Sequence, residues 1–256
     1  MKTKRAKVLG FDVDIISFDD VIQETVERIK NKQGTHIITI NPEIIEEAQK
    51  NDELANILNN AEIVVADGVG IKLALKLKGI EQERIPGIDL AAKLIEQANK
   101  FKFRTALIGA KKSVNAAAEQ KIRDLYPNID ICYTHHGYFQ RSDDDTIIKE
   151  LKRQFPNLIL VALGSPKQEL FIQKCRKEIP DATYIGIGGS FDVWAGVVER
   201  APEFFIIMNC EWIYRTFKQP QRLKRIYKTL PLFAIKAIIE ARDYNKKRKG
   251  NVKQSH

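Results

Sequence analysis

The sequence has no long apolar run and few cysteines, and each shortage excludes a class of protein. The longest stretch without a charged residue, from Gln154 to Pro166, has 13 residues, whereas a membrane-spanning helix needs about 20 apolar ones. The three cysteines are widely spaced and form no C-x-x-C pair, which excludes a disulfide scaffold and favours buried, reduced thiols in a cytosolic protein. The composition, 44% hydrophobic and 29% charged, is typical of a soluble globular protein.

The first residues also lack the features of a secretory signal. A basic start is followed by Asp12 and Asp14, which interrupt the apolar segment that a signal peptide requires. We therefore expect the protein to act in the cytoplasm.

The net charge of +9 comes entirely from the last fifth of the chain. Residues 1–202 hold 29 basic and 29 acidic side chains, and residues 203–256 hold 13 basic and four acidic ones. This division predicts an α/β domain over residues 1–202 and a basic helical appendage over residues 203–256. A basic appendage indicates an anionic partner, either a membrane surface or a nucleic acid.

Prolines divide the appendage, and each can begin a helix because proline fits the first helical turn. Pro202, Pro220 and Pro231 therefore predict three short helices, at residues 203–217, 221–230 and 231–245. The last of these places apolar residues on one face and lysines and arginines on the other, which is typical of a membrane-surface helix. The alternative is a helix packed on the body with a solvated outer face, and the sequence leaves both open.

Six short β-branched segments alternate with helical patterns between Thr35 and Gly189. They lie at residues 35–40, 62–66, 103–109, 129–134, 158–164 and 182–188. This alternation predicts a Rossmann-like α/β fold, in which a mostly parallel sheet is covered by helices on both faces. Residues 8–15 are expected to add an edge strand or a hairpin.

Four of the predicted strands run into polar or glycine-rich sequence. The residues at these strand ends are Thr39, Asn41, Asp67, Gly68, Gln168, Gly188 and Gly189. In open α/β sheets, ligands bind beyond the carboxyl ends of the strands. We therefore expect one binding site at this edge of the sheet.

Asp67 is the sharpest candidate, because it follows an apolar strand and precedes a glycine. A carboxylate in this position could act as a general base toward a hydroxyl group, or it could cap the following helix. The pairs Gly68–Gly70 and Gly188–Gly189 could bring backbone N–H groups to a phosphate, or they could form tight turns. Neither pair completes G-x-G-x-x-G, which disfavours a nicotinamide enzyme.

The sequence predicts no metal and no cofactor. The acids at 12 and 14 and at 143–145 resemble the D-x-D motif of metal-dependent sugar transferases. However, the first pair lies in a strand pattern, and the second group opens a helix, where acids favour the helix dipole. His135 and His136 have no further ligands at metal spacing, so we interpret them as a structural pair.

Eight sequence blocks occur in order over about residues 10–225. They are ITINPE (38–43), ADGVGI (66–71), ERIPGIDL (83–90), HHGYF (135–139), LGSPKQE (163–169), GIGGSFDVWAG (186–196), RAPEF (200–204) and EWIYR (211–215). Together they resemble the WecG/TagA/CpsF glycosyltransferases. The resemblance implies an inverting, metal-independent sugar transferase, peripheral on the inner face of the bacterial cell membrane.

The resemblance also implies the substrates. The donor is a UDP-sugar, and the acceptor is GlcNAc-diphosphate-undecaprenol. We expect the TagA-like branch, which transfers N-acetylmannosamine to C4 of the GlcNAc for wall teichoic acid. Other donors, UDP-ManNAcA or UDP-Glc for common antigen or capsule synthesis, stay open, and so does a homo-oligomer.

The same resemblance implies a role for each residue that matches a position of the family's motifs. Asp67 matches the catalytic base, and Thr39 and Asn41 match a polar pair that lines the sugar pocket. Arg84 matches an arginine that meets diphosphate charge, and Gln168 matches a residue that contacts the donor. Three basic residues of the appendage match arginines that could close over the site: Arg215, Arg222 and Arg225.

Two other classes stay as alternatives. A nucleic-acid-binding protein would follow phosphates with its basic appendage, but the chain has no recognised nucleic-acid motif, and we predict no such partner. A Rossmann-type dehydrogenase would need the dinucleotide fingerprint that this chain lacks.

Overall fold

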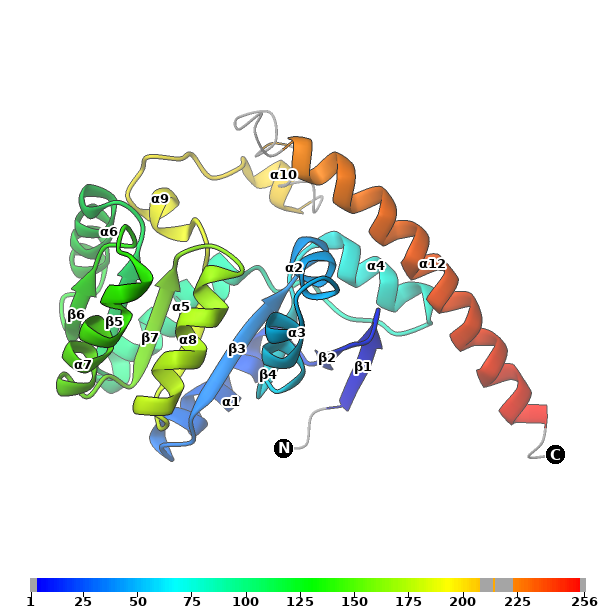
Figure 1. The fold of residues 1–256 in the computed structure, drawn as a ribbon, viewed down its shortest axis with the longest axis horizontal. Coiled ribbons are helices and arrows are strands. Elements are labelled where there is room, and N and C mark those ends of the chain that lie inside the picture. Colours follow the sequence, from blue (N-terminus) through cyan, green and yellow to red (C-terminus); the bar gives the residue numbers. More distant parts are fainter. Residues whose placement is uncertain (1–3, 208–213, 215–222, 254–256) are drawn as a thin grey trace.

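The computed structural model describes residues 4–207, 214 and 223–253. Within them, six strands form one sheet in the order β4-β3-β8-β7-β5-β6 (Figure 1). The strands are β3 Thr35–Ile40, β4 Ile63–Ala66, β5 Thr105–Gly109, β6 Ile131–His135, β7 Leu158–Ala162 and β8 Thr183–Gly186. All five neighbouring pairs are parallel, which confirms the predicted α/β fold.

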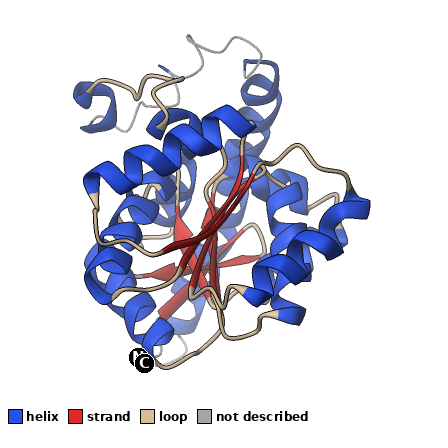
Figure 2. Ribbon diagram, turned by 90° about the vertical axis from the view of Figure 1, so that its left-hand side faces the viewer, coloured by secondary structure: helices blue, strands red, loops and turns tan. Residues whose placement is uncertain are grey.

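Helices cover both faces of the sheet, as the view in Figure 2 shows. One side is covered by α1 Phe18–Lys30, α5 Gly87–Phe101 and α6 Lys112–Leu125. The other side is covered by α2 Pro42–Ala48, α3 Asp52–Asn59, α4 Val69–Leu77, α7 Asp144–Arg153 and α8 Lys167–Glu178. The short η1 Arg141–Asp143 directly precedes α7. Alternate residues of β7 enter different clusters: Leu158 and Leu160 pack toward α5 and α6, and Ile159 and Val161 toward α7 and α8. β7 is buried throughout, as expected of a central strand.

The N-terminal residues form a hairpin, from β1 Lys4–Val8 and β2 Phe11–Ile15, which is one of the two alternatives predicted for residues 8–15 and begins four residues earlier. The hairpin is a separate two-stranded sheet. Buried Asp14 joins it to β4: its Oδ2 accepts a hydrogen bond from the Val64 N–H at 2.7 Å, and its Oδ1 lies 2.8 Å from Arg5 Nε. Both carboxylate oxygens of Asp14 therefore make structural contacts.

The prediction that Pro231 begins a new helix is wrong. The C-terminal elements are α9 Ser190–Trp194, α10 Glu203–Ile207 and α12 Leu223–Lys253, and Pro231 lies inside α12. Proline in a helix interior costs about 3 kcal/mol relative to alanine. Here Phe233, Ala237 and Ala241 bury one continuous helix face, and this packing offsets the local cost. Residues 208–213 and 215–222, which include parts of the helices predicted at 203–217 and 221–230, lie outside the described residues.

The helix α12 lies across α2 and α4 on the outside of the body (Figure 1). Two ion pairs hold it there: Lys236 Nζ is 2.8 Å from Glu46 Oε2, and Glu240 Oε2 is 2.6 Å from Lys78 Nζ. The division of the chain at residue 202 stays a prediction. Among the described helices, none combines the length and the apolarity needed to cross a bilayer.

The cysteines follow the prediction in part. Cys175 in α8 is buried, and burial raises the pKa of its thiol. Cys132 is only half-buried, because β6 is an edge strand of the sheet. Cys210 lies outside the described residues.

Candidate active site

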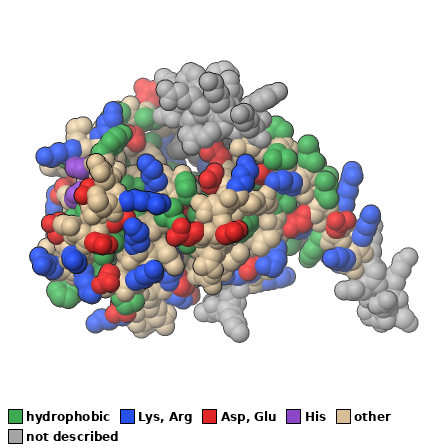
Figure 3. Space-filling model, viewed as in Figure 1, with side chains coloured by type: hydrophobic (Ala, Val, Ile, Leu, Met, Phe, Trp, Pro, Cys, Tyr) green, Lys and Arg blue, Asp and Glu red, His purple; other side chains and the backbone are tan. Residues whose placement is uncertain are grey.

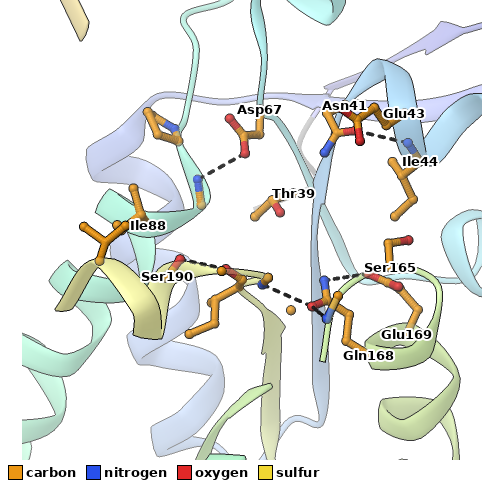
Figure 4. Close-up of a pocket in the computed structure, with 18 of the residues that line it drawn as sticks. Thr39, Asn41, Glu43, Ile44, Asp67, Ile88, Ser165, Gln168, Glu169 and Ser190 are labelled. Atoms are coloured by element: carbon orange, nitrogen blue, oxygen red, sulfur yellow. Dashed lines mark hydrogen bonds between the residues drawn. The ribbon is translucent and has the colours of Figure 1, made fainter. Parts of the chain in front are cut away.

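A cavity of about 540 Å³ opens at the carboxyl ends of β3, β4, β7 and β8 (Figure 4). This volume is within the usual range for small-molecule sites. The predicted site residues in its lining are Thr39, Asn41, Asp67, Arg84, Gln168, Gly188 and Gly189. The fold thus brings together residues that are up to 150 positions apart in the sequence, while their individual roles stay predictions.

Asp67 directly follows β4, and its backbone N–H donates to the Ile40 carbonyl at the end of β3. The carboxylate is about one quarter exposed. Its Oδ2 accepts from the Gly87 N–H at 3.4 Å, and its Oδ1 lies 3.5 Å from Arg84 Nε. The loop that carries Arg84 and Gly87 is itself fixed to β4, because the Ile85 N–H donates to the Ala66 carbonyl. The carboxylate is therefore held in place and still reachable from the cavity.

The alternative prediction, that Asp67 caps the next helix, is wrong. The N-cap of α4 is Gly68, with a φ of 98° and no side-chain capping bond. The positive φ favours glycine and turns the chain directly into the helix. Gly68 is not among the described residues that line the cavity, and its role as a phosphate donor stays a prediction.

Asn41 and Thr39 come from the end of β3. Asn41 caps α2: its Oδ1 accepts from the Ile44 N–H at 3.0 Å, and Pro42 occupies the first helical position. Asn41 also lines the cavity, and its amide nitrogen is a hydrogen-bond donor. The Thr39 side chain packs against Gly87, where an added Cβ would lie 3.1 Å from Thr39 Cγ2.

Gln168, on α8, is buried, and its amide is engaged inside the protein. Its Oε1 accepts from the N–H groups of Gly164, at 3.2 Å, and Gly188, at 3.1 Å. Its Nε2 donates to Glu169 Oε1 at 2.8 Å. The Gly188 N–H, predicted to meet a phosphate, is thus used by Gln168 in this structure.

Acidic side chains dominate the wall of the cavity. Besides Asp67, they are Glu43, Glu46, Glu47, Glu169, Asp192 and Glu199. In the described part of the lining, the basic side chains are Lys50 and Arg84. A ligand with a diphosphate would therefore need more positive charge than the described wall supplies.

The appendage reaches this cavity. Tyr214 and Thr229 of the appendage both belong to the lining, and the Tyr214 hydroxyl donates to Glu199 Oε2 at 3.3 Å. Arg225 lies in α12, one helical turn before Thr229; its side chain, and the whole of Arg215 and Arg222, lie outside the described residues.

The motifs that resembled metal sites have structural partners. Asp12 pairs with Lys7 at 3.1 Å, Asp144 pairs with Lys174 at 2.6 Å, and His135 Nδ1 lies 2.7 Å from the neighbouring carbonyl oxygen. Over the described ranges of the chain, no three His, Cys, Asp or Glu side chains form a group that could hold a metal ion. The absence of a metal and of a cofactor stays a prediction.

The sequence assigned no role to several residues of the cavity wall, among them Glu169, Glu199 and Tyr214. Glu169 and Tyr214 belong to the blocks LGSPKQE and EWIYR, and Glu199 directly precedes RAPEF. Their positions in or directly beside these blocks were the signal that could have identified them.

Comparison with known proteins agrees with this geometry. A family model described as "Glycosyl transferase WecG/TagA/CpsF family" matches residues 6–247. An N-acetylglucosaminyldiphosphoundecaprenol N-acetyl-beta-D-mannosaminyltransferase of Bacillus subtilis (strain 168) is 38% identical over 246 residues, 94% of each chain. A protein of the same name from Staphylococcus aureus (strain MW2) is 35% identical over 241 residues, 91% of this chain and 92% of the relative. The chain therefore belongs to the WecG/TagA/CpsF family of glycosyltransferases.

Proposed function

We propose that this enzyme transfers N-acetylmannosamine from UDP-ManNAc to the C4 hydroxyl of GlcNAc-diphosphate-undecaprenol, with inversion at the anomeric carbon. The product would serve as the linkage unit of wall teichoic acid. The observation that carries the proposal is the Asp67 carboxylate, held at the strand ends on the wall of a sugar-sized cavity. The names of the relatives from B. subtilis and S. aureus support the choice of substrates.

In the proposed reaction, the acceptor oxygen attacks the anomeric carbon of the donor. The bond from that carbon to the β-phosphate oxygen breaks, UDP leaves with the electron pair, and the hydroxyl proton passes to Asp67. Attack on the face opposite the leaving group inverts the configuration. The Gly87 N–H and Arg84 keep the carboxylate oriented toward the cavity.

The departing UDP carries negative charge that the acidic wall would repel. Arg84 is one cation at the site, and we assign the remaining neutralisation to Arg215, Arg222 and Arg225 of the appendage, without a metal. The position of Thr229 in the cavity lining supports this assignment, because the appendage borders the site.

We also propose that the enzyme attaches to the anionic inner face of the cell membrane, where its lipid-linked acceptor is found. Opposite the buried face of α12, four large apolar side chains are exposed: Leu232, Ile235, Ile238 and Ile239. Figure 3 shows hydrophobic side chains gathered along this helix beside lysines and arginines. A helix with an exposed apolar face and flanking basic residues is typical of an interfacial element. The helix is thus packed on the body, as one of the two interpretations predicts, and membrane binding by its outer face is part of this proposal.

Turnover of a short-chain GlcNAc-diphosphate lipid with UDP-ManNAc tests the role of Asp67. Asp67→Asn should lower kcat by about 10²–10⁴, the usual contribution of a general base, while UDP binding by calorimetry is retained. The matched control is Asp145→Asn, an exposed aspartate of α7 outside the cavity, which should keep the wild-type rate. An unchanged rate in Asp67→Asn would remove the base role.

The donor is tested in the same assay. We expect UDP-ManNAc to be turned over faster than UDP-ManNAcA or UDP-Glc. A preference for either of the other two would keep the glycosyltransferase mechanism and reject the proposed donor.

A further inference from the structure

We infer that Glu169 is a positioning residue of this site: it orients the amide of Gln168, which in turn fixes the two glycine loops that form one wall of the cavity. The loops are residues 163–166, between β7 and α8, and residues 187–189, between β8 and α9. The inference rests on the proposed function for its consequence in catalysis. The hydrogen-bond arrangement behind it is independent of the substrate.

The hydrogen-bond geometry distinguishes the oxygen of the Gln168 amide from its nitrogen. Two backbone N–H groups, of Gly164 and Gly188, point at one atom of the amide, and only an oxygen can accept both. The NH₂ group must then face Glu169, whose Oε1 accepts it at 2.8 Å. Figure 4 shows Gln168 and Glu169 side by side at the base of α8, with dashed bonds that link Gln168 to both loops.

The path of Gln168 depends on a glycine beneath it. A Cβ added to Gly186 would lie 2.4 Å from Gln168 Nε2, so the side chain crosses directly over the end of β8. Gly164 and Gly188 have φ values of 76° and 51°, and glycine loops of this kind have few side chains of their own to hold them. The Gln168 amide links the two loops by accepting a hydrogen bond from each, and we call this pair of bonds the tie.

Glu169 is only 2% exposed, and in the folded protein its Oε1, rather than bulk water, accepts from the Gln168 amide. Burial raises the pKa of this carboxyl, while hydrogen bonds with Gln168, its own backbone N–H and Ser165 oppose the rise. A carboxyl group offers an acceptor oxygen in either protonation state. The positioning role therefore needs no ionisation, whereas a role in proton transfer would.

Four variants test the inference, by kcat/KM for UDP-ManNAc at pH 8. Glu169→Gln retains an acceptor oxygen for Gln168, and its activity should fall by no more than about threefold. Glu169→Ala strands a buried NH₂ group, and its activity should fall roughly tenfold or more. The activity of Gln168→Glu should fall by a similar factor, because two acceptor side chains, at positions 168 and 169, then face each other.

The double variant Gln168→Glu/Glu169→Gln is the decisive one. The carboxylate introduced at position 168 can accept from both glycine N–H groups and also from the amide introduced at position 169. Activity should therefore recover by about tenfold relative to Gln168→Glu alone. Failure of this rescue, or a Glu169→Gln variant as inactive as Glu169→Ala, would overturn the inference.

Hydrogen exchange tests the tie without using the reaction. The amides of Gly164 and Gly188 should exchange at least tenfold faster in Glu169→Ala than in wild type or Glu169→Gln, with the exchange of β5 unchanged as a folding control. Equal exchange in all three proteins would contradict the tie. If the wild type turns over none of the three UDP-sugars, the proposed function fails, and the exchange result still decides the role of Glu169.

Discussion

His36 in β3 is fully enclosed, and both of its ring nitrogens lack a hydrogen-bond partner within the described residues. Burial lowers the pKa of this imidazole from its ordinary 6.5 to about 3, and the nearby Arg176 guanidinium contributes to the same shift. Arg176 itself pairs with Glu62, which accepts the His36 backbone N–H. The folded protein therefore holds His36 in its neutral form over a wide range of pH.

This burial predicts a loss of stability in mild acid. Because the folded pKa lies below the unfolded one, the contribution of His36 is complete above pH 6.5 and is lost progressively as the pH falls from about 6.5 to about 3. At pH 5 the loss should be about 2 kcal/mol, since each pKa unit corresponds to about 1.4 kcal/mol. In His36→Phe, the drop in unfolding free energy between pH 7.5 and pH 5, measured in urea, should be smaller by this amount. An equal drop in both proteins would contradict the assignment.

At the same scale, the sequence identified the strand-end residues but not all of the contacts that they make in the fold. Thr39, Asn41, Asp67 and Gln168 could be predicted to converge because parallel strands end at one edge of a sheet. That the Gln168 amide is used internally could not be predicted, because it depends on how closely α8 crosses Gly186. The role of Asp67 was ambiguous because an aspartate between a strand and a glycine can be either a general base or a helix cap. The structure excludes the cap, since Gly68 is the N-cap of α4.

At the scale of elements, each of the six strands predicted between Thr35 and Gly189 is present in the structure, and the errors are at their ends. The segment 158–164 includes Leu163 and Gly164, but β7 ends at Ala162. Gly164 has a φ of 76°, so the chain turns while the apolar pattern continues. The same limit explains Pro231: a proline is a local signal for a helix start, whereas the packing of α12 on the body is a long-range contact that the local pattern does not reveal.

The attachment of α12 depends on a nearly buried ion pair. Lys78 Nζ donates to Glu240 Oε2 and to the Lys7 carbonyl, and the Lys78 side chain is only 4% exposed. Glu240→Ala would leave this ammonium without its carboxylate, and would also remove the acceptor of the Leu9 N–H. We expect a loss of about 2 kcal/mol in unfolding free energy, below the usual cost for a fully buried pair because Glu240 is partly exposed.

A protease and hydrogen-exchange comparison locates this effect. In Glu240→Ala, α12 should be cleaved and exchanged faster than in wild type, while β7 keeps its protection. Asp243→Ala removes an exposed carboxylate from the same helix and should leave both measurements unchanged. Equal behaviour of the two variants would show that the Lys78 pair does not hold α12.

At the scale of the whole molecule, α12 connects the proposed membrane surface with the active site. On its inner face, Phe233 is 2% exposed and packs near Gly70, where an added Cβ would lie 3.3 Å from its ring. Gly70 is the second residue of α4, three positions after Asp67. A membrane held against the outer face of α12 would therefore lie one helix thickness, about 10 Å, from the start of α4, the helix that follows the proposed base.

This arrangement predicts that the exposed apolar face of α12 contributes to membrane binding directly. Ile235 and Ile239 are 58% and 54% exposed in the free protein, so serine at both positions should leave the fold intact. Their burial in a lipid interface should contribute about 25 cal/mol per Å² of apolar surface, and Ile235→Ser/Ile239→Ser should bind phosphatidylglycerol vesicles at least about tenfold more weakly in a flotation assay. Leu125→Ser on α6, which replaces a side chain that is 60% exposed, is the matched control and should bind as wild type does.

Salt separates the apolar contribution from the electrostatic one. Raising the ionic strength screens the attraction between the basic appendage and anionic lipid, so wild-type binding should weaken with salt. The double serine variant should weaken by the same factor, because its charges are unchanged and only its apolar contact is lost. If the serine variant bound as tightly as the wild type at every salt concentration, the attachment would be electrostatic alone, and the apolar face of α12 would have to be covered by something other than lipid.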